Sequence, residues 1–172
     1  MKATKLLEQQ HKKVKAMFKK LESGRSDPRP ILQELANDLI AHMAIEHEIF
    51  YPAVEALDRS LVAESLEEHS LAELALKRLL ATDPADESFK ARVSATKELI
   101  EHHVEEEEED LFPRVEKKLG DEKLEQLGKQ MRTRFAEVQT AGFEEMAPRG
   151  FARTLADLEK KLSLKGPKKR AA

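Results

Sequence analysis

The sequence predicts an all-α protein, an up-down-up-down four-helix bundle with an additional C-terminal helix and tail. The chain has only six glycines, one tyrosine and no tryptophan in 172 residues, and this composition favours helices over a sheet. Apolar residues recur at alternating steps of three and four in four successive segments, which is the spacing of one buried helix face. The connections between these segments are short, so consecutive helices are expected to be antiparallel neighbours.

The first two helices are bounded by glycine and proline. The first is expected over about residues 4–23, because Gly24 ends it. Two prolines within residues 25–30 are expected to keep that stretch out of a helix. The second helix is expected from residue 31 to about residue 57, with Pro52 kinking it or changing its last turn.

The third and fourth helices begin at residues that commonly cap helices. Ser60 is the expected N-cap of a helix that continues to about residue 81. Asp83 followed by Pro84 predicts the start of the fourth helix, because proline is well tolerated at the first helical position. That helix is expected to end at Gly120, which closes the four-helix bundle at residues 1–120.

The C-terminal third differs from the bundle. Residues 121–146 are expected to form a helix that Asp121 caps and that packs on the bundle. Its apolar stripe contains no metal-ligand residue and consists of Leu124, Leu127, Met131, Phe135 and Val138. Residues 147–172 contain glycines, prolines and a terminal Lys-Lys-Arg cluster, which predicts a mobile basic tail.

Composition excludes several classes of function. The chain has no cysteine, so disulfides, thiolate metal sites and cysteine nucleophiles are absent. A formal net charge of -3 gives no reason to expect nucleic-acid binding. We find neither a signal-peptide pattern nor an apolar run of about 18 residues, which predicts a soluble, cytoplasmic protein without a membrane partner. The sequence leaves the oligomeric state open.

Histidines and glutamates interrupt every apolar stripe near its middle. Three stretches place a histidine four residues before a glutamate, which brings both side chains to one face of a helix. These pairs and one further histidine are His42 and Glu46, His69 and Glu73, His103 and Glu107, and His11. Burying so many ionisable groups without partners would cost several kcal/mol each, so bound cations are expected among them.

An internal repeat supports the same prediction. His42, Glu46 and Pro52 recur, shifted by 61 positions, as His103, Glu107 and Pro113. The chain therefore has the pattern of two related helical hairpins, each of which would supply part of a paired metal site.

These residues resemble the hemerythrin-like, or HHE cation-binding, domains over roughly residues 1–120. The resemblance is carried by the lone His11, by the His42–Glu46 and His69–Glu73 pairs, and most specifically by the run HHVEEEEEDLFP at residues 102–113. It implies a di-iron centre with an oxo or hydroxo bridge. It also implies that His11 and His42 bind one iron, that His69, Glu73 and His103 bind the other, and that Glu46 and Glu107 bridge them.

The sequence departs from the oxygen-carrying hemerythrins at two positions. Those proteins have a histidine where this chain has Glu73, and an aspartate five residues after the histidine of the fourth helix. The departures argue against simple reversible oxygen carriage and leave His102, five residues before Glu107, as an alternative to His103. The alternative that Glu73 only orients a metal-binding histidine, without contacting the metal, also stays open. His47 lies off the stripe and is expected to face solvent.

Imidazole and carboxylate ligands without sulfur favour iron, with manganese or zinc as substitutes. We therefore expect a non-haem di-iron protein that binds O2, H2O2 or NO and changes redox state, in sensing or detoxification of oxidants. The His11/His42 iron, with fewer protein ligands, is the expected open position. The alternative is an oxygen or iron binding or storage module without turnover. The sequence does not decide whether a weak peroxidase-type or oxidase-type activity exists.

Overall fold

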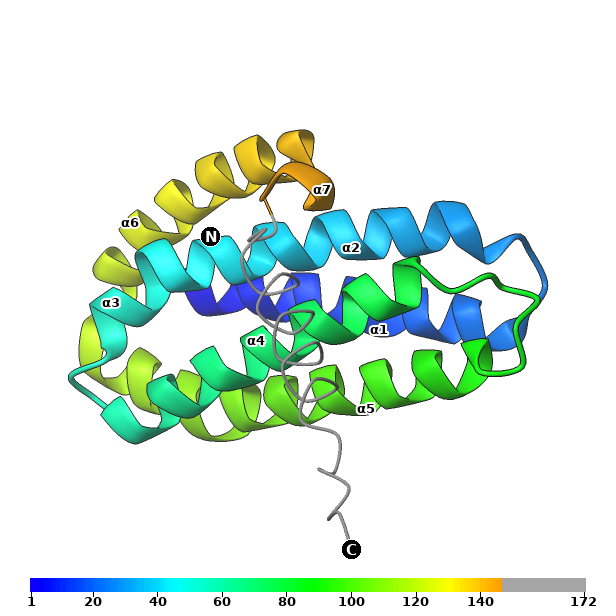
Figure 1. Cartoon of the computed structure of the whole chain (residues 1–172). Helices are drawn as coiled ribbons and strands as arrows, with labels where there is room; N and C mark the ends of the chain where they lie inside the picture. The colour runs from blue at the N-terminus through cyan, green and yellow to red at the C-terminus, as the bar shows by residue number, and fades with distance from the viewer. Residues whose placement is uncertain (147–172) are drawn as a thin grey trace, which may run out of the picture.

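The computed structural model describes residues 1–146, which form helices joined by short turns and loops (Figure 1). The predicted tail at residues 147–172 lies outside the described residues. The α-helices are α1 (Ala3–Ser23), α2 (Pro28–Ile45), α3 (Tyr51–Val54), α4 (Arg59–Leu80), α5 (Phe89–Glu106), α6 (Phe112–Ala141) and α7 (Phe143–Met146). Two π-helical turns, η1 (Glu46–Phe50) and η2 (Glu107–Leu111), join α2 to α3 and α5 to α6.

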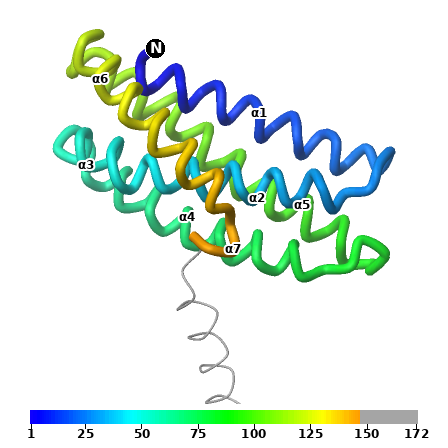
Figure 2. The backbone as a smooth tube through the Cα atoms, turned by 90° about the horizontal axis from the view of Figure 1, so that it is seen from above, coloured from blue at the N-terminus to red at the C-terminus, as the bar shows by residue number. Residues whose placement is uncertain are grey.

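The predicted four-helix bundle is confirmed. Helices α1, α2, α4 and α5 run alongside one another with alternating direction (Figures 1 and 2). Their apolar stripes form two core clusters. One contains Phe18, Leu35 and Leu76, and the other contains Leu7, Phe50 and Tyr51. The histidines and glutamates of the stripes lie between these two clusters.

Helix α6 continues past the bundle and folds back on it. Gly120 has a φ of 70°, which breaks the helix where the fourth bundle helix was expected to end. The part of α6 after Gly120 packs against α1 and α2 (Figure 2). The chain's first residues cross it at Gly128, where a β-carbon would clash with the carbonyl oxygen of Met1. This helix therefore covers the bundle without supplying a ligand-type side chain to its interior.

Two helices begin earlier than predicted. Helix α2 starts at Pro28 rather than at residue 31, because the Asp27 carboxylate accepts a hydrogen bond from the backbone N–H of Arg29 at 3.1 Å. Proline is compatible with the first turn, where the backbone N–H groups have no partner within the helix. Helix α4 is capped by Asp58 and not by Ser60, since the Asp58 carboxylate accepts from the backbone N–H of Leu61 at 3.1 Å.

The predicted start of the fourth helix at Pro84 is wrong, because α5 begins at Phe89. The Asp83 carboxylate accepts from the backbone N–H of Ala85 at 2.9 Å, and the Asp86 carboxylate accepts from that of Ser88 at 2.8 Å. Such local bonds stabilise turns in place of a helix.

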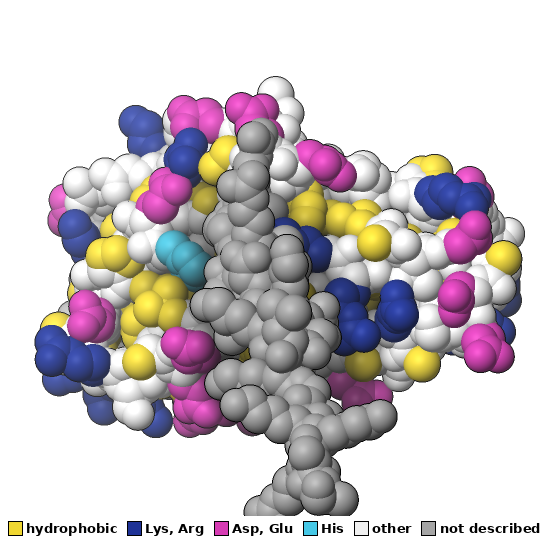
Figure 3. Space-filling view, in the orientation of Figure 1, with side chains coloured by type: hydrophobic (Ala, Val, Ile, Leu, Met, Phe, Trp, Pro, Cys, Tyr) yellow, Lys and Arg dark blue, Asp and Glu magenta, His cyan; other side chains and the backbone are white. Residues whose placement is uncertain are grey.

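On the face shown in Figure 3, the described residues present both acidic and basic side chains among apolar ones. Among residues 1–146, we find no helix that combines the length and the apolar character needed to cross a membrane.

Candidate metal centre

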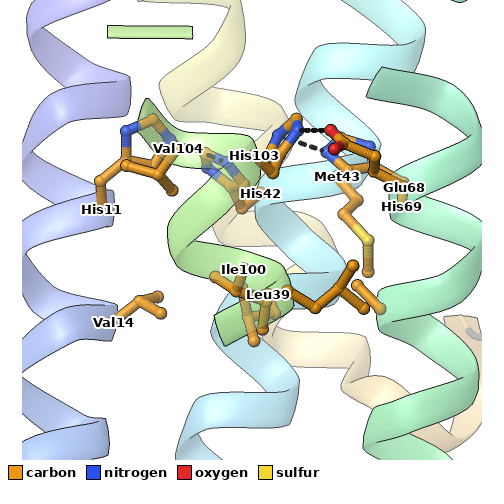
Figure 4. Close-up of a pocket in the computed structure, with 12 residues that line it drawn as sticks. His11, Val14, Leu39, His42, Met43, Glu68, His69, Ile100, His103 and Val104 are labelled. Atoms are coloured by element: carbon orange, nitrogen blue, oxygen red, sulfur yellow. Dashed lines mark hydrogen bonds and ion pairs between the residues drawn. The ribbon is translucent and has the colours of Figure 1, made fainter. Parts of the chain in front are cut away.

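Four histidines, one from each bundle helix, meet near the middle of the bundle. His11 of α1, His42 of α2, His69 of α4 and His103 of α5 are all buried and lie at one level (Figure 4). The Nε2 atoms of His11 and His42 are 3.2 Å apart, and those of His69 and His103 are 2.9 Å apart. The four helices thus direct two pairs of imidazole nitrogens toward each other.

Two glutamates connect these histidine pairs. Glu46 Oε2 lies 3.2 Å from His42 Nε2 and 3.4 Å from His69 Nε2. Glu107 Oε2 lies 3.4 Å from His11 Nε2 and 3.7 Å from His103 Nε2.

The donors divide into two groups, within each of which the ligand atoms lie within 4.8 Å of one another. One group contains His11, His42, Glu46 and Glu107, and the other contains Glu46, His69 and His103. Glu46 belongs to both groups, so its carboxylate is placed to bridge two cations.

The glutamates start the two π-turns. Glu46 and Glu107 are the first residues of η1 and η2, and the two turns are separated by the same 61 positions as the sequence repeat. A π-turn adds a residue to the helical ring and is frequent at functional sites. Each π-turn is followed directly by a buried aromatic residue, Tyr51 after η1 and Phe112 after η2.

The carboxylates are buried without enough hydrogen-bond partners. Both oxygens of Glu46 and the Oε2 atom of Glu107 have no hydrogen-bond partner among the described residues. Only Glu107 Oε1 has one, since the Tyr51 hydroxyl donates to it at 2.9 Å. A buried polar atom left in this condition costs about 1–3 kcal/mol, and cations between the carboxylates and the histidines would remove that cost.

A second ring of side chains holds the outward nitrogen of each histidine. The Nδ1 atoms lie 2.7 to 2.8 Å from an acceptor in all four cases. The acceptors are Glu108 for His11, Gln10 for His42, His47 for His69, and Glu68 for His103. A proton on each Nδ1 leaves the Nε2 lone pair directed into the centre, which is the arrangement of a metal-binding imidazole.

The sequence reasoning missed most of this outer ring. His47 was expected to face solvent, and it is largely exposed, but its Nε2 also bonds to His69. Glu68 precedes His69 by one residue and lies off the predicted stripe, yet its carboxylate accepts from His103 across the α4–α5 interface. An acidic side chain flanking a ligand position on a neighbouring helix is the signal that could have found it.

Glu73 differs from the other six predicted ligands, because it belongs to neither of the two groups formed by described residues. Its carboxylate accepts from the Lys77 ammonium group, one turn further along α4. Helix α4 stays α-helical through this region, whereas the other two histidine–glutamate pairs run into a π-turn. The structure also separates the two candidate histidines of α5: the His103 side chain is 7% exposed and that of His102 is 62% exposed.

Burial and neighbouring charges shift the pKa values of the centre in opposite directions. Burial lowers the pKa of His42 and His69 well below the usual range, and repulsion from nearby histidines adds to this. Burial, with the neighbouring Glu107, raises the pKa of Glu46 well above its usual range. Burial also acts to raise the pKa of Glu107, but attraction to His103 and His11 outweighs it and lowers that pKa to about 2. Without a cation, Glu46 therefore binds its proton more tightly than an ordinary glutamate, and Glu107 binds its proton less tightly.

An apolar cavity of about 20 Å³ adjoins the histidines. Val14, Leu39 and Ile100 lie on one side of the four imidazole rings (Figure 4) and line it together with Met43, Leu99 and Val104. A space of this size holds about one small molecule.

Comparisons with known proteins agree with this geometry. The family model of the hemerythrin HHE cation binding domain matches residues 2–115. The crystal structure of a hemerythrin HHE cation binding domain-containing protein from Mycobacterium kansasii has a TM-score of 0.75 and 28% sequence identity, covering 88% of this chain and 96% of that one. An uncharacterised protein of Mycobacterium tuberculosis is 24% identical over 156 residues, again 88% of this chain and 96% of that protein.

A protein of Nostoc sp. described as a DNA nickase is 29% identical over 133 residues. These residues are 75% of this chain but 38% of that protein, so the chain spans well under half of the relative's length. The family match covers most of the chain and includes all six converging residues, and the chain belongs to the hemerythrin HHE cation-binding domain family.

Proposed function

We propose that His11, His42, His69 and His103, with Glu46 and Glu107, hold two iron ions, and that the protein binds O2, peroxide or NO there and changes redox state. The observation that carries this proposal is the pair of donor groups that share Glu46. Nitrogen and carboxylate oxygen donors without sulfur suit iron or manganese. Two ions would also satisfy the three carboxylate oxygens that have no hydrogen-bond partner among the described residues.

The iron pair, when bound, supplies one-electron redox chemistry and open coordination positions. The protein residues orient and shield it. Glu46 and Glu107 bring two negative charges between the histidine pairs, and Tyr51 fixes Glu107 by donating to its other oxygen. Acceptors on every Nδ1 hold the imidazole rings in place. The two apolar clusters on either side exclude water from the centre.

The apolar cavity supports a small, neutral ligand. Its lining is almost entirely aliphatic beyond the histidine rings, so it suits an uncharged molecule such as O2 or NO better than an anion. The cavity touches histidines of both groups. The open position expected at the His11/His42 iron counts Glu73 as a ligand of the other iron. With Glu73 paired to Lys77, each donor group has two histidines.

The test is to remove metal, reconstitute with ferrous iron without oxygen, and measure iron per chain and the optical spectrum. We expect two ions per chain and a spectral change on adding O2, H2O2 or NO. Continued consumption of repeated H2O2 additions would identify turnover. Glu46→Gln should lower iron content, while the matched control Glu73→Gln should not. Iron that stays bound with an unchanged spectrum would point to the alternative, a binding or storage module, and refute the redox proposal.

A further inference from the structure

A smaller cluster of donors lies on the outer side of the metal centre, between α4 and α5. It consists of Glu68, His102 and Glu106, and one ligand atom of each lies within 4.8 Å of the others. His102 Nε2 is 3.8 Å from Glu68 Oε1 and 3.5 Å from Glu106 Oε1. Two donors that bind one ion at about 2.1 Å lie roughly 3.0–3.4 Å apart. Small side-chain rotations would therefore bring all three to one cation.

The carboxylates of this cluster are poorly compensated. Glu106 Oε2 is buried and has no hydrogen-bond partner among the described residues. The Glu68 side chain, a second carboxylate, is 11% exposed and lies beside it. His102, the one basic member of this cluster, lies no closer to the two carboxylates than the distances given above. A positive ion would offset both the repulsion between the two carboxylates and the missing hydrogen bond.

We propose that Glu68, His102 and Glu106 form a third cation site, which binds a divalent first-row metal ion such as Mn²⁺, Fe²⁺ or Zn²⁺. One imidazole and two carboxylates are ligands that these ions share. The His102 side chain is 62% exposed and that of Glu106 is 25% exposed, so water completes the coordination and the ion exchanges with solvent. The six donors of the centre, in contrast, are enclosed by the bundle.

The third site is connected to the centre through one carboxylate. Glu68 Oε2 accepts from His103 Nδ1 at 2.8 Å (Figure 4), while Glu68 Oε1 faces His102. The side chains become steadily more buried along the path from His102 through Glu106 and Glu68 to His103, with exposed fractions of 62%, 25%, 11% and 7%. The outer ion would therefore lie one carboxylate away from a histidine of the centre.

The experiment compares wild type with the double variant His102→Ala/Glu106→Gln at equal free Mn²⁺, by equilibrium dialysis with elemental analysis. Glu105→Gln is the matched control, because Glu105 is an exposed neighbour on the same helix and loses the same charge. Both substituted positions of the double variant are at least partly exposed, so the helical circular dichroism should be unchanged. We expect the double variant to bind one ion per chain fewer than wild type and the control.

Equal numbers of ions at equal affinity in all three proteins would overturn the third site. Loss of more than one ion per chain in the double variant would also overturn it, because His102 and Glu106 would then serve the centre. The outcome separates the two proposals. If only the third site binds metal, wild type binds one ion per chain and the double variant binds none. If wild type binds no ion, both the metal centre and the third site are refuted.

Discussion

Replacing Glu46 by glutamine should stabilise the metal-free protein and destabilise the metal-loaded one. In the metal-free chain, both oxygens of this fully buried carboxylate lack hydrogen-bond partners among the described residues. A glutamine side chain of the same shape carries no charge. Its amide can donate to His42 Nε2, which lies 3.2 Å from the present Glu46 Oε2. Since an unsatisfied buried polar group costs about 1–3 kcal/mol, the metal-free variant should gain stability of that order.

The loaded protein should respond in the opposite direction, because Glu46 alone among residues 1–146 belongs to both donor groups. An amide oxygen is a weaker, uncharged ligand. A hundredfold loss of metal affinity would remove about 2.7 kcal/mol of the stability gained from binding. At about 2–4 °C per kcal/mol for a chain of this size, the melting temperatures should cross: the variant melts higher with chelator and lower with metal.

The same substitution should also change how the stability of the metal-free protein depends on pH. The pKa of Glu46 is raised in the folded chain, so the folded state holds more protons than the unfolded state once the pH exceeds the ordinary carboxyl value of about 4.3. The metal-free wild type should therefore lose stability as pH rises through that window, and Glu46→Gln should lose less. Melting curves with chelator between about pH 4 and pH 8 measure it, with Glu73→Gln as control. A variant that melts lower in both states, or a gap that does not widen with pH, would refute the reasoning.

Three further outcomes follow from the same contacts. His103→Ala should lower the number of ions in the centre, as measured by elemental analysis. Glu73→Gln should leave that number unchanged and lower the stability only by the ~0.3–0.5 kcal/mol of a helix ion pair. Metal loss in the Glu73 variant would instead indicate that Glu73 is a ligand. Glu68→Leu removes the hydrogen-bond acceptor of His103 and should weaken metal binding about 10–100-fold. A competition titration with a chromophoric chelator measures this affinity. Unchanged affinity would show that this hydrogen bond does not contribute to metal binding. Gly128→Ala should destabilise the chain by about 1–3 kcal/mol in urea unfolding, because the Met1 carbonyl leaves no room for a methyl group there. An unchanged urea midpoint would mean that the N-terminal residues can shift away from residue 128 at no cost.

The sequence predicted the elements that depend on regular helical spacing. Six ligand-type residues on four stripes converge because each stripe keeps its period up to the centre. Glu73 shows the limit of this reasoning: its spacing from His69 equals that of the other pairs, but Lys77 competes for its carboxylate and no π-turn follows. The acceptor role of Glu68 depends on the approach of two helices, which a one-dimensional pattern does not contain. The start of α5 was misplaced because side-chain bonds of Asp83 and Asp86 favour turns over a helix.

The two π-turns have a consequence for how the domain tolerates sequence change. Each turn fixes the number of residues between a glutamate of the centre and the aromatic ring that follows it, from Glu46 to Tyr51 and from Glu107 to Phe112. A one-residue deletion there would rotate everything that follows by about 100° and carry the Tyr51 hydroxyl away from Glu107. Exposed positions inside the turns, such as Glu48 and Glu109, can change identity without this effect. In an alignment of relatives, a gap in this stretch would therefore mark loss of the site more reliably than any substitution around it.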